Sequence, residues 1–99
     1  MMRCQLRDYV IADGRMEEFL DAWRNGVVPL RESFGFRILG SWRGEGVDRF
    51  VWVVGHEGDF ETAEAEYYAS PDREALDPDP RAFIVTADVR FMRPVSVSP

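Results

Sequence analysis

The sequence predicts one α+β domain whose elements follow the order strand, helix, strand, strand, helix, strand. Its length of 99 residues suits a single domain. Four runs of strand length are apolar or alternate apolar with polar residues, and two longer stretches repeat their apolar residues every three or four positions. Two helices on one face of a four-stranded antiparallel sheet, the ferredoxin-like arrangement, satisfy this βαββαβ order. The domain is expected to span residues 1–93, with a short C-terminal tail over residues 94–99.

The first strand and the first helix are predicted from two different hydrophobic periods. Residues 4–11 alternate apolar and polar side chains, as in a strand with two unlike faces. Residues 16–34 carry one apolar stripe in steps of three and four, and the charged residues, including Arg31, are assigned to the other side of the helix. Pro29 is expected to kink this helix, because it removes a hydrogen bond, and Gly35 to end it in a left-handed cap.

The centre of the sequence predicts a hairpin. Residues 36–42 and 49–55 have strand patterns, and the link over residues 43–48 is polar and rich in glycine. The run over residues 50–54 is apolar on both faces, which is typical of a strand that is covered on both sides. The second strand of the hairpin is therefore expected in the middle of the sheet.

The last third of the chain predicts a helix, a short helical turn and a final strand. Asp59 is predicted to cap the helix, and Ser70-Pro71 to start a new turn with proline in its first position. Residues 76–80 contain two prolines and predict an extended connector, after which residues 82–92 form the last strand. The inward stripe of the helix is expected to consist of Phe60, Ala63, Tyr67 and Tyr68.

One face of the predicted sheet is left uncovered by the helices. That face carries apolar side chains from the central strand, either the set Phe50, Trp52 and Val54 or the pair Val51 and Val53. Such an apolar patch in contact with water is typical of an interface. We therefore expect the chain to pair with a second copy, sheet against sheet, as a homodimer.

The composition argues against several classes of protein. A formal net charge of −6 disfavours a nucleic-acid partner, and the absence of lysine excludes Schiff-base catalysis and a Walker-type phosphate loop. Cys4 and His56 are the only residues of their kinds, so we expect neither an intrachain disulfide nor a cysteine-rich zinc site, and no metal or cofactor is predicted. The N-terminus lacks a signal-peptide pattern, and no apolar run approaches the ~20 residues of a membrane span. A cytoplasmic setting without membrane contact is therefore expected.

Several segments together resemble the NIPSNAP family. The resemblance begins at Gln5-Leu6-Arg7-Asp8-Tyr9 and extends over nearly the whole chain. It continues through residues 14–19, 29–36, 39–42, 49–52, 67–71 and 88–90. The resemblance implies a dimeric α/β barrel, in which two such sheets face each other, and it leaves the biochemical function undefined.

The wider superfamily of that fold contains cofactor-free monooxygenases, lactone isomerases and haem-degrading enzymes, which are analogies of fold alone. The haem-degrading members typically use a histidine from the second helix. This sequence offers Tyr67 and Tyr68 there instead, so haem is not expected.

His56 and Asp88 are the predicted catalytic residues. His56 is the only side chain that titrates near neutral pH when unperturbed, and it follows the third strand, where it could act as a general base. Asp88 lies on the last strand, where it could move a proton or pair with Arg7. A solvated histidine at a strand end and a purely structural ion pair are the alternatives.

A cleft between the helices and the sheet is the predicted ligand site. A tyrosine hydroxyl in such a cleft could donate to a carbonyl or enolate oxygen of a small aromatic ligand, and Arg7 could hold an anionic group. The alternative is that the aromatic rings simply fill the core. The predicted ligand-binding residues are Arg7, Tyr9, Trp23, Trp52, Tyr67 and Tyr68.

Two functions of different kinds follow from this pattern. In the first, a homodimer binds a small apolar or aromatic molecule in the cleft, with cofactor-free monooxygenase or isomerase chemistry on that molecule. In the second, the chain is a non-catalytic module whose dimer surface binds a partner protein and whose interior is filled. The sequence does not decide whether the protein is an enzyme.

Overall fold

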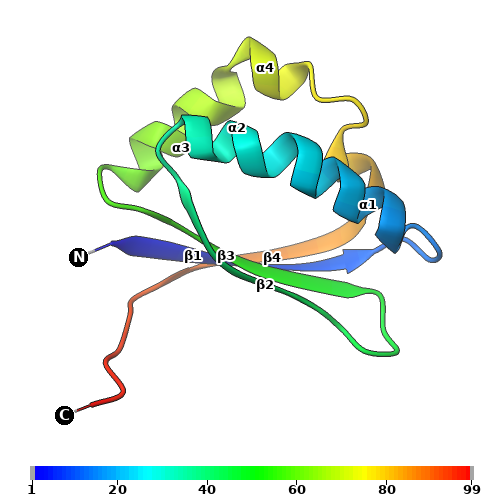
Figure 1. The fold of residues 1–99 in the computed structure, drawn as a ribbon, viewed down its shortest axis with the longest axis horizontal. Coiled ribbons are helices and arrows are strands. Elements are labelled where there is room, and N and C mark those ends of the chain that lie inside the picture. Colours follow the sequence, from blue (N-terminus) through cyan, green and yellow to red (C-terminus); the bar gives the residue numbers. More distant parts are fainter. Residues whose placement is uncertain (1, 99) are drawn as a thin grey trace.

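A four-stranded antiparallel sheet forms one layer of the molecule, and the helices form the other (Figure 1). The structure, a computed structural model, describes residues 2–98. The strands lie in the order β2-β3-β1-β4, which confirms the ferredoxin-like arrangement and the central position of the hairpin's second strand, β3. The strands are β1 (Arg3–Ile11), β2 (Arg37–Arg43), β3 (Arg49–His56) and β4 (Ile84–Met92).

The helices cover one face of the sheet in two groups (Figure 1). The first group runs without a break through α1 (Met16–Ala22), the π-helical turn η1 (Trp23–Val27) and α2 (Val28–Ser33). The second group consists of α3 (Phe60–Ala69), α4 (Pro71–Glu74) and the 3₁₀ turn η2 (Pro80–Phe83).

The first helix accommodates Pro29 by means of the π-helical turn. The N–H of Val28 donates to the carbonyl of Trp23, five residues earlier, and this wider turn closes just before the proline. Pro29 then lies in the first turn of α2, where its lack of an N–H is tolerated. The predicted interruption of one helix is therefore present as a wider turn.

The final strand begins at Ile84, later than the predicted residue 82, because Ala82 and Phe83 belong to η2. The Asp79 side chain accepts a hydrogen bond from the N–H of Arg81 at 3.0 Å and so caps that turn. This local side-chain bond competes with strand formation in the first residues of the predicted strand.

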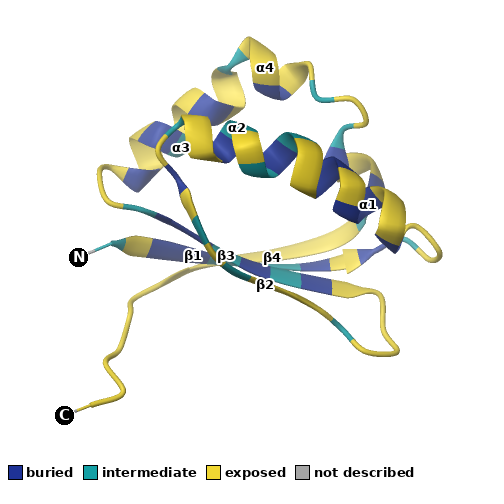
Figure 2. Cartoon of the chain, viewed as in Figure 1, coloured by how far each residue is buried: buried dark blue, intermediate teal, exposed yellow. Residues whose placement is uncertain are grey.

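The core lies between the two layers, as the burial colours of Figure 2 show. Phe50, Trp52 and Val54 are almost inaccessible beneath the helices, so Val51 and Val53 are the members of β3 that face the other way. We call the side of the sheet opposite the helices the open face. By strand register, its apolar side chains include Cys4, Leu6, Val10, Trp42, Val51, Val53 and Met92.

Arg31 is buried, contrary to its assignment to the charged side of the first helix. Only 1% of its surface is exposed. Arg31 follows Trp23 and Val27 in steps of four residues, so all three side chains lie on the helix face that packs against the sheet. The spacing indicates this position, but an arginine is almost never buried without a partner, and that partner is remote in the sequence.

The predicted helix ends are confirmed at three positions. Asp59 Oδ1 accepts from the N–H of Thr62 at 3.1 Å, and Ser70 Oγ accepts from the N–H of Arg73 at 3.1 Å. Gly35, which follows the first helix, has a φ of 86°, in the left-handed region that favours glycine.

We expect Gly35→Ala to lower the free energy of unfolding by about 1–2 kcal/mol or more, because a left-handed backbone costs an L-residue roughly that amount. A Cβ at this position would also lie 2.9 Å from Nε2 of His56. Gly14→Ala is the matched control, since Gly14 has a φ of 72° but no atom within 4 Å of the added Cβ. Denaturant unfolding followed by circular dichroism measures both losses. Equal losses would show that the contact with His56 adds nothing.

Candidate functional site

A cavity of about 340 Å³ lies between the helices and the sheet, beside the edge strand β4. Its walls come from β1, β3 and β4 on the sheet side and from the first helix, α3 and α4 on the helix side. All six predicted ligand-binding residues line it: Arg7, Tyr9, Trp23, Trp52, Tyr67 and Tyr68. The structure thus brings these six together, and their role in binding stays a prediction.

The rest of the lining comes from three arginines, the start of β4 and two apolar residues. Arg31, Arg73 and Arg81 contribute guanidinium groups, the start of β4 contributes residues 84–87, and Val27 and Pro80 complete the lining. None of the lining residues carries a carboxylate or an imidazole. The cavity therefore combines aromatic walls with an excess of hydrogen-bond donors.

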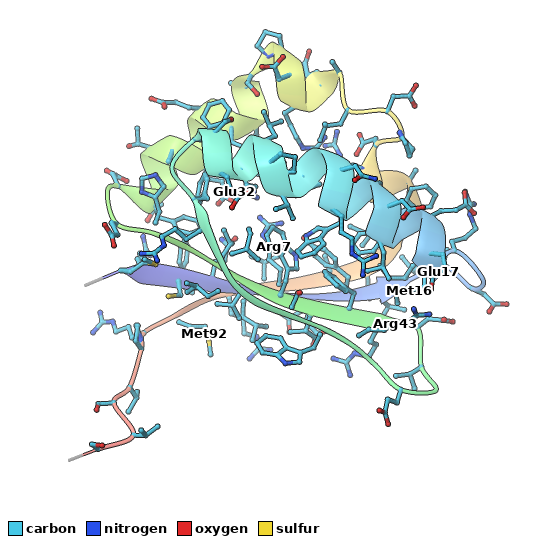
Figure 3. The ribbon with its side chains drawn as sticks, viewed as in Figure 1. Arg7, Met16, Glu17, Glu32, Arg43 and Met92 are labelled. Atoms are coloured by element: carbon cyan, nitrogen blue, oxygen red, sulfur yellow. The ribbon has the colours of Figure 1, made fainter. Side chains whose placement is uncertain are left out.

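Arg7 points from the centre of β1 into the space between the layers, where Figure 3 labels it. Its Nε donates to Gln5 Oε1 at 2.8 Å, Nη1 to the Tyr9 hydroxyl at 3.0 Å and Nη2 to Glu64 Oε1 at 2.9 Å. Burial opposes the charge, but Tyr9, Tyr68 and Glu64 outweigh it and raise the pKa of Arg7 above its ordinary value. Arg7 is held as a permanent cation in one geometry.

Glu64 on α3 forms ion pairs with both Arg7 of β1 and Arg31 of α2. Its Oε1 accepts from Arg7 and also from Nη1 and Nη2 of Arg31, both at 3.2 Å. Arg31 also donates to the Tyr68 hydroxyl at 3.2 Å, and its guanidinium carbon lies 4.2 Å from the centre of the Tyr67 ring. One carboxylate thus compensates two buried cations, and aromatic faces supply the rest of their surroundings.

Several buried donors around the cavity have no hydrogen-bond partner among the described residues. They are Trp23 Nε1, Trp52 Nε1, Arg31 Nε and, on Arg73, both Nε and Nη1. Buried polar groups in proteins are nearly always paired, so such a cluster is unusual. All of these donors belong to residues that line the cavity.

Tyr67 offers a protonated hydroxyl beside this cavity. Burial raises its pKa above the ordinary value, and the nearby Arg31 and Arg73 offset this only in part. The phenol therefore stays neutral at physiological pH and can donate a hydrogen bond to an oxygen of a bound molecule.

His56 lies at the end of β3 and does not line the cavity. Its Nδ1 accepts from the N–H of Gly58 at 2.9 Å, which leaves the proton on Nε2, 3.0 Å from the carbonyl oxygen of Phe34. Nε2 therefore links the end of the first helix to β3, and Nδ1 fixes the turn that follows β3. This placement does not favour the predicted role of His56 as a general base.

The predicted pairing of Arg7 with Asp88 is wrong. Asp88 is the direct neighbour of Asp8 across β1 and β4, so it lies on the open face, whereas Arg7 points to the helices. Asp88 instead pairs with Arg90 two residues away, at 3.0 Å. Strand register, which the sequence does not reveal, separates the two side chains, and Asp88 is not part of the cavity lining.

Sequence reasoning missed Glu64, Arg31 and Arg73. Glu64 lies four residues after the buried Phe60, so its spacing places it toward the inward side of α3 and carries a signal, whereas Tyr68, also predicted on that side, is 39% exposed. Arg31 has a similar signal. Arg73 lies in a four-residue helical turn and has none, since only the fold brings that turn over the cavity.

Within residues 2–98, no cluster of three or more His, Cys, Asp or Glu side chains could hold a metal ion. In the same part of the chain, no helix combines the length and apolar character needed to cross a membrane.

The fold and its cavity define a ferredoxin-like α+β domain with a cavity between its helices and its sheet. The sequence profile of the NIPSNAP family matches residues 4–99, and the chain therefore belongs to the NIPSNAP family. A search of curated proteins finds no match to this sequence.

Solved structures with the same fold include other members of this family. One is a NIPSNAP family protein from Agrobacterium tumefaciens, at 18% identity and a TM-score of 0.87, with 100% of this chain and 98% of that chain covered. Another is an uncharacterized NIPSNAP domain protein from Burkholderia xenovorans, at 19% identity and a TM-score of 0.79, covering 100% and 99%. A protein provisionally assigned as an antibiotic biosynthesis monooxygenase, from Bacteroides thetaiotaomicron, reaches 14% identity and a TM-score of 0.74, covering 99% and 93%.

Proposed function

We propose that this protein binds a small aromatic molecule in the cavity between its helices and its sheet. The carrying observation is a cavity of about 340 Å³ that is walled by aromatic rings and carries unpaired donors. Small-molecule sites typically measure about 300–1,000 Å³ and combine apolar walls with a few placed polar groups. The alternative, a non-catalytic interaction module with a filled interior, leaves such a cavity unexplained.

The walls suit a flat aromatic ring. Trp23 and Trp52 meet edge to face, with ring centres 5.5 Å apart, and Tyr67 and Tyr68 do the same at 5.0 Å. Such geometries offer both ring edges and ring faces to a guest, the arrangements that aromatic pairs prefer. An aromatic molecule gains more from this lining than an aliphatic one of the same volume.

The proposal includes a reaction of the bound molecule, either cofactor-free oxygenation or isomerisation, which an activity assay tests. The protonated hydroxyl of Tyr67 can stabilise an enolate oxygen. The lining supplies no imidazole or carboxylate as a proton acceptor, so a substrate with an acidic C–H is the class to test first. Oxygen consumption and product formation are measured with each molecule that binds.

Blocking the cavity tests binding itself. Ala87 lines the cavity from β4, opposite Tyr9, and Ala87→Phe is expected to weaken binding of aromatic probes at least tenfold, about 1.4 kcal/mol. Val89→Phe is the matched control, since Val89 lies on the same side of the same strand but does not line this cavity. Titration calorimetry with 2-naphthamide measures both. Equal affinity in the two variants would place the bound probe elsewhere.

We also propose that the open face pairs with the open face of a second copy. Its apolar side chains surround two ion pairs, Asp8 with Arg49 and Asp88 with Arg90. This balanced mixture of apolar groups and opposite charges is self-complementary, as a two-fold interface must be. Family membership and the ferredoxin-like sheet support the same pairing.

A further inference from the structure

We infer that the molecule bound in the cavity is an aromatic acid, whose carboxylate is recognised by Arg73. This inference rests on the proposed function and adds the chemical class of the ligand. Two observations support it: the residues around the cavity offer unpaired hydrogen-bond donors, and they carry more positive than negative charge.

Arg73 is buried without the contacts that such a burial requires. Only 5% of its surface is exposed, and its Nε and Nη1 have no acceptor among residues 2–98. The remaining nitrogen, Nη2, makes one long contact of 3.4 Å with Asp79 Oδ1. Arg7, in the same cavity, has all three nitrogens paired at 2.8–3.0 Å. The two arginines thus differ sharply, and Arg73 is the one left available to a ligand.

The charges around the cavity are also incomplete. Arg7 and Arg31 share Glu64, and Arg73 shares Asp79 with the exposed Arg81. Three largely buried guanidinium groups thus depend on two carboxylates, one of which also pairs with a solvent-exposed arginine. The whole chain has a formal net charge of −6, and yet this cavity has a positive excess. A buried excess of charge is costly unless a counter-ion compensates it, and an anionic ligand does so.

Asp79 does not remove the need for a ligand at Arg73. Its carboxylate is engaged mainly with Arg81, whose Nη2 lies 2.9 Å from Oδ2 and whose Nε lies within 3.3 Å of both oxygens. Arg81 is the main cause of the lowered pKa of Asp79, ahead of Arg73. Asp79 therefore positions Arg73 without saturating its donors.

The two tryptophan N–H groups complete the recognition of an acceptor. Trp23 Nε1 and Trp52 Nε1 are buried donors with no hydrogen-bond partner among residues 2–98, and both residues line the same cavity as Arg73. A carboxylate accepts several hydrogen bonds and donates none, so it matches a lining that is rich in donors. A neutral amide of the same shape brings donors of its own and loses the attraction to the guanidinium group.

The test compares two probes of nearly equal shape, 2-naphthoate and 2-naphthamide, by titration calorimetry at pH 7. We expect the wild-type protein to bind the acid at least tenfold more tightly than the amide. Arg73→Met keeps an apolar stem of similar length, and it is expected to reduce the ratio of the two affinities to about one by weakening the acid alone. Arg90→Met removes an exposed arginine of the open face and is expected to leave the ratio unchanged.

Each outcome bears on one of the two proposals. Binding of both probes with equal affinity in the wild-type protein would overturn the recognition of an acid and leave the aromatic site intact. A preference for the acid that survives in Arg73→Met would assign recognition to another group and overturn the role of Arg73. Binding of neither probe would overturn the aromatic site as well. Thermal melting of Arg73→Met checks its fold, and the wild-type comparison does not depend on that variant.

Discussion

Glu64→Gln is expected to lower the free energy of unfolding by about 3 kcal/mol. Breaking a buried ion pair by removing one partner costs about 3–5 kcal/mol, because the other charge is left uncompensated. Glu64 pairs with Arg7 and Arg31, whose side chains are 12% and 1% exposed, while its own is 19% exposed. The partial access of water to Glu64 places the loss near the lower end of that range.

Denaturant unfolding measures this loss, and Glu61→Gln is the matched control. Glu61 lies three residues earlier on α3 and pairs with Arg3, but these side chains are 69% and 47% exposed. Exposed pairs contribute about 0–1 kcal/mol, so the control is expected to stay below that value. In the Arg31→Met protein, Glu64→Gln should lower the free energy of unfolding by clearly less, because only Arg7 is then left without its carboxylate partner. Equal losses for Glu64→Gln and Glu61→Gln would contradict the buried position of this cluster.

Much of the fold could be predicted from local patterns. The alternation of residues 4–11 and the stripe at 16–34 each have one clear period, which is enough to assign a strand or a helix. The run at 50–54 has no period, but its short length and its β-branched and aromatic residues are typical of a covered strand. The side of β3 that faces the helices could not be assigned, because both of its sides are apolar. Only the register against β1, in which Trp52 is the neighbour of Arg7, settles it.

In the candidate site, too, local patterns predict some residues, and the contacts between distant segments remain unpredicted. Its aromatic residues could be predicted, because large rings on inward faces of neighbouring elements must meet in the core. The charge pattern could not, since Arg7 and Glu64 are 57 positions apart and their contact depends on the packing of α3 over β1. The predicted contact of Asp88 with Arg7 is wrong for a similar reason, because a shift of one residue moves a side chain to the other face of a sheet.

Val53→Asp is expected to convert a dimer into a monomer. Val53 lies on the open face in the central strand β3, next to Leu6 of β1 and Gly40 of β2, so two-fold pairing of open faces buries it. A carboxylate buried there without a partner costs several kcal/mol, and near a two-fold axis it also meets its own copy. We expect the dissociation constant to rise at least a hundredfold, about 2.8 kcal/mol.

Sedimentation velocity at micromolar concentration measures the subunit number, and Val47→Asp is the control. Val47 is an exposed apolar residue in the loop between β2 and β3, away from the sheet, so the same added charge there should leave the dimer intact. A monomeric wild-type protein would contradict the pairing of open faces, and a dimeric Val53→Asp protein would move the interface elsewhere. Binding of 2-naphthamide should persist in the Val53→Asp monomer, because the cavity lies between the helices and the sheet, whereas Val53 lies on the open face. Loss of binding together with the dimer would instead mean that the second copy holds the cavity in shape.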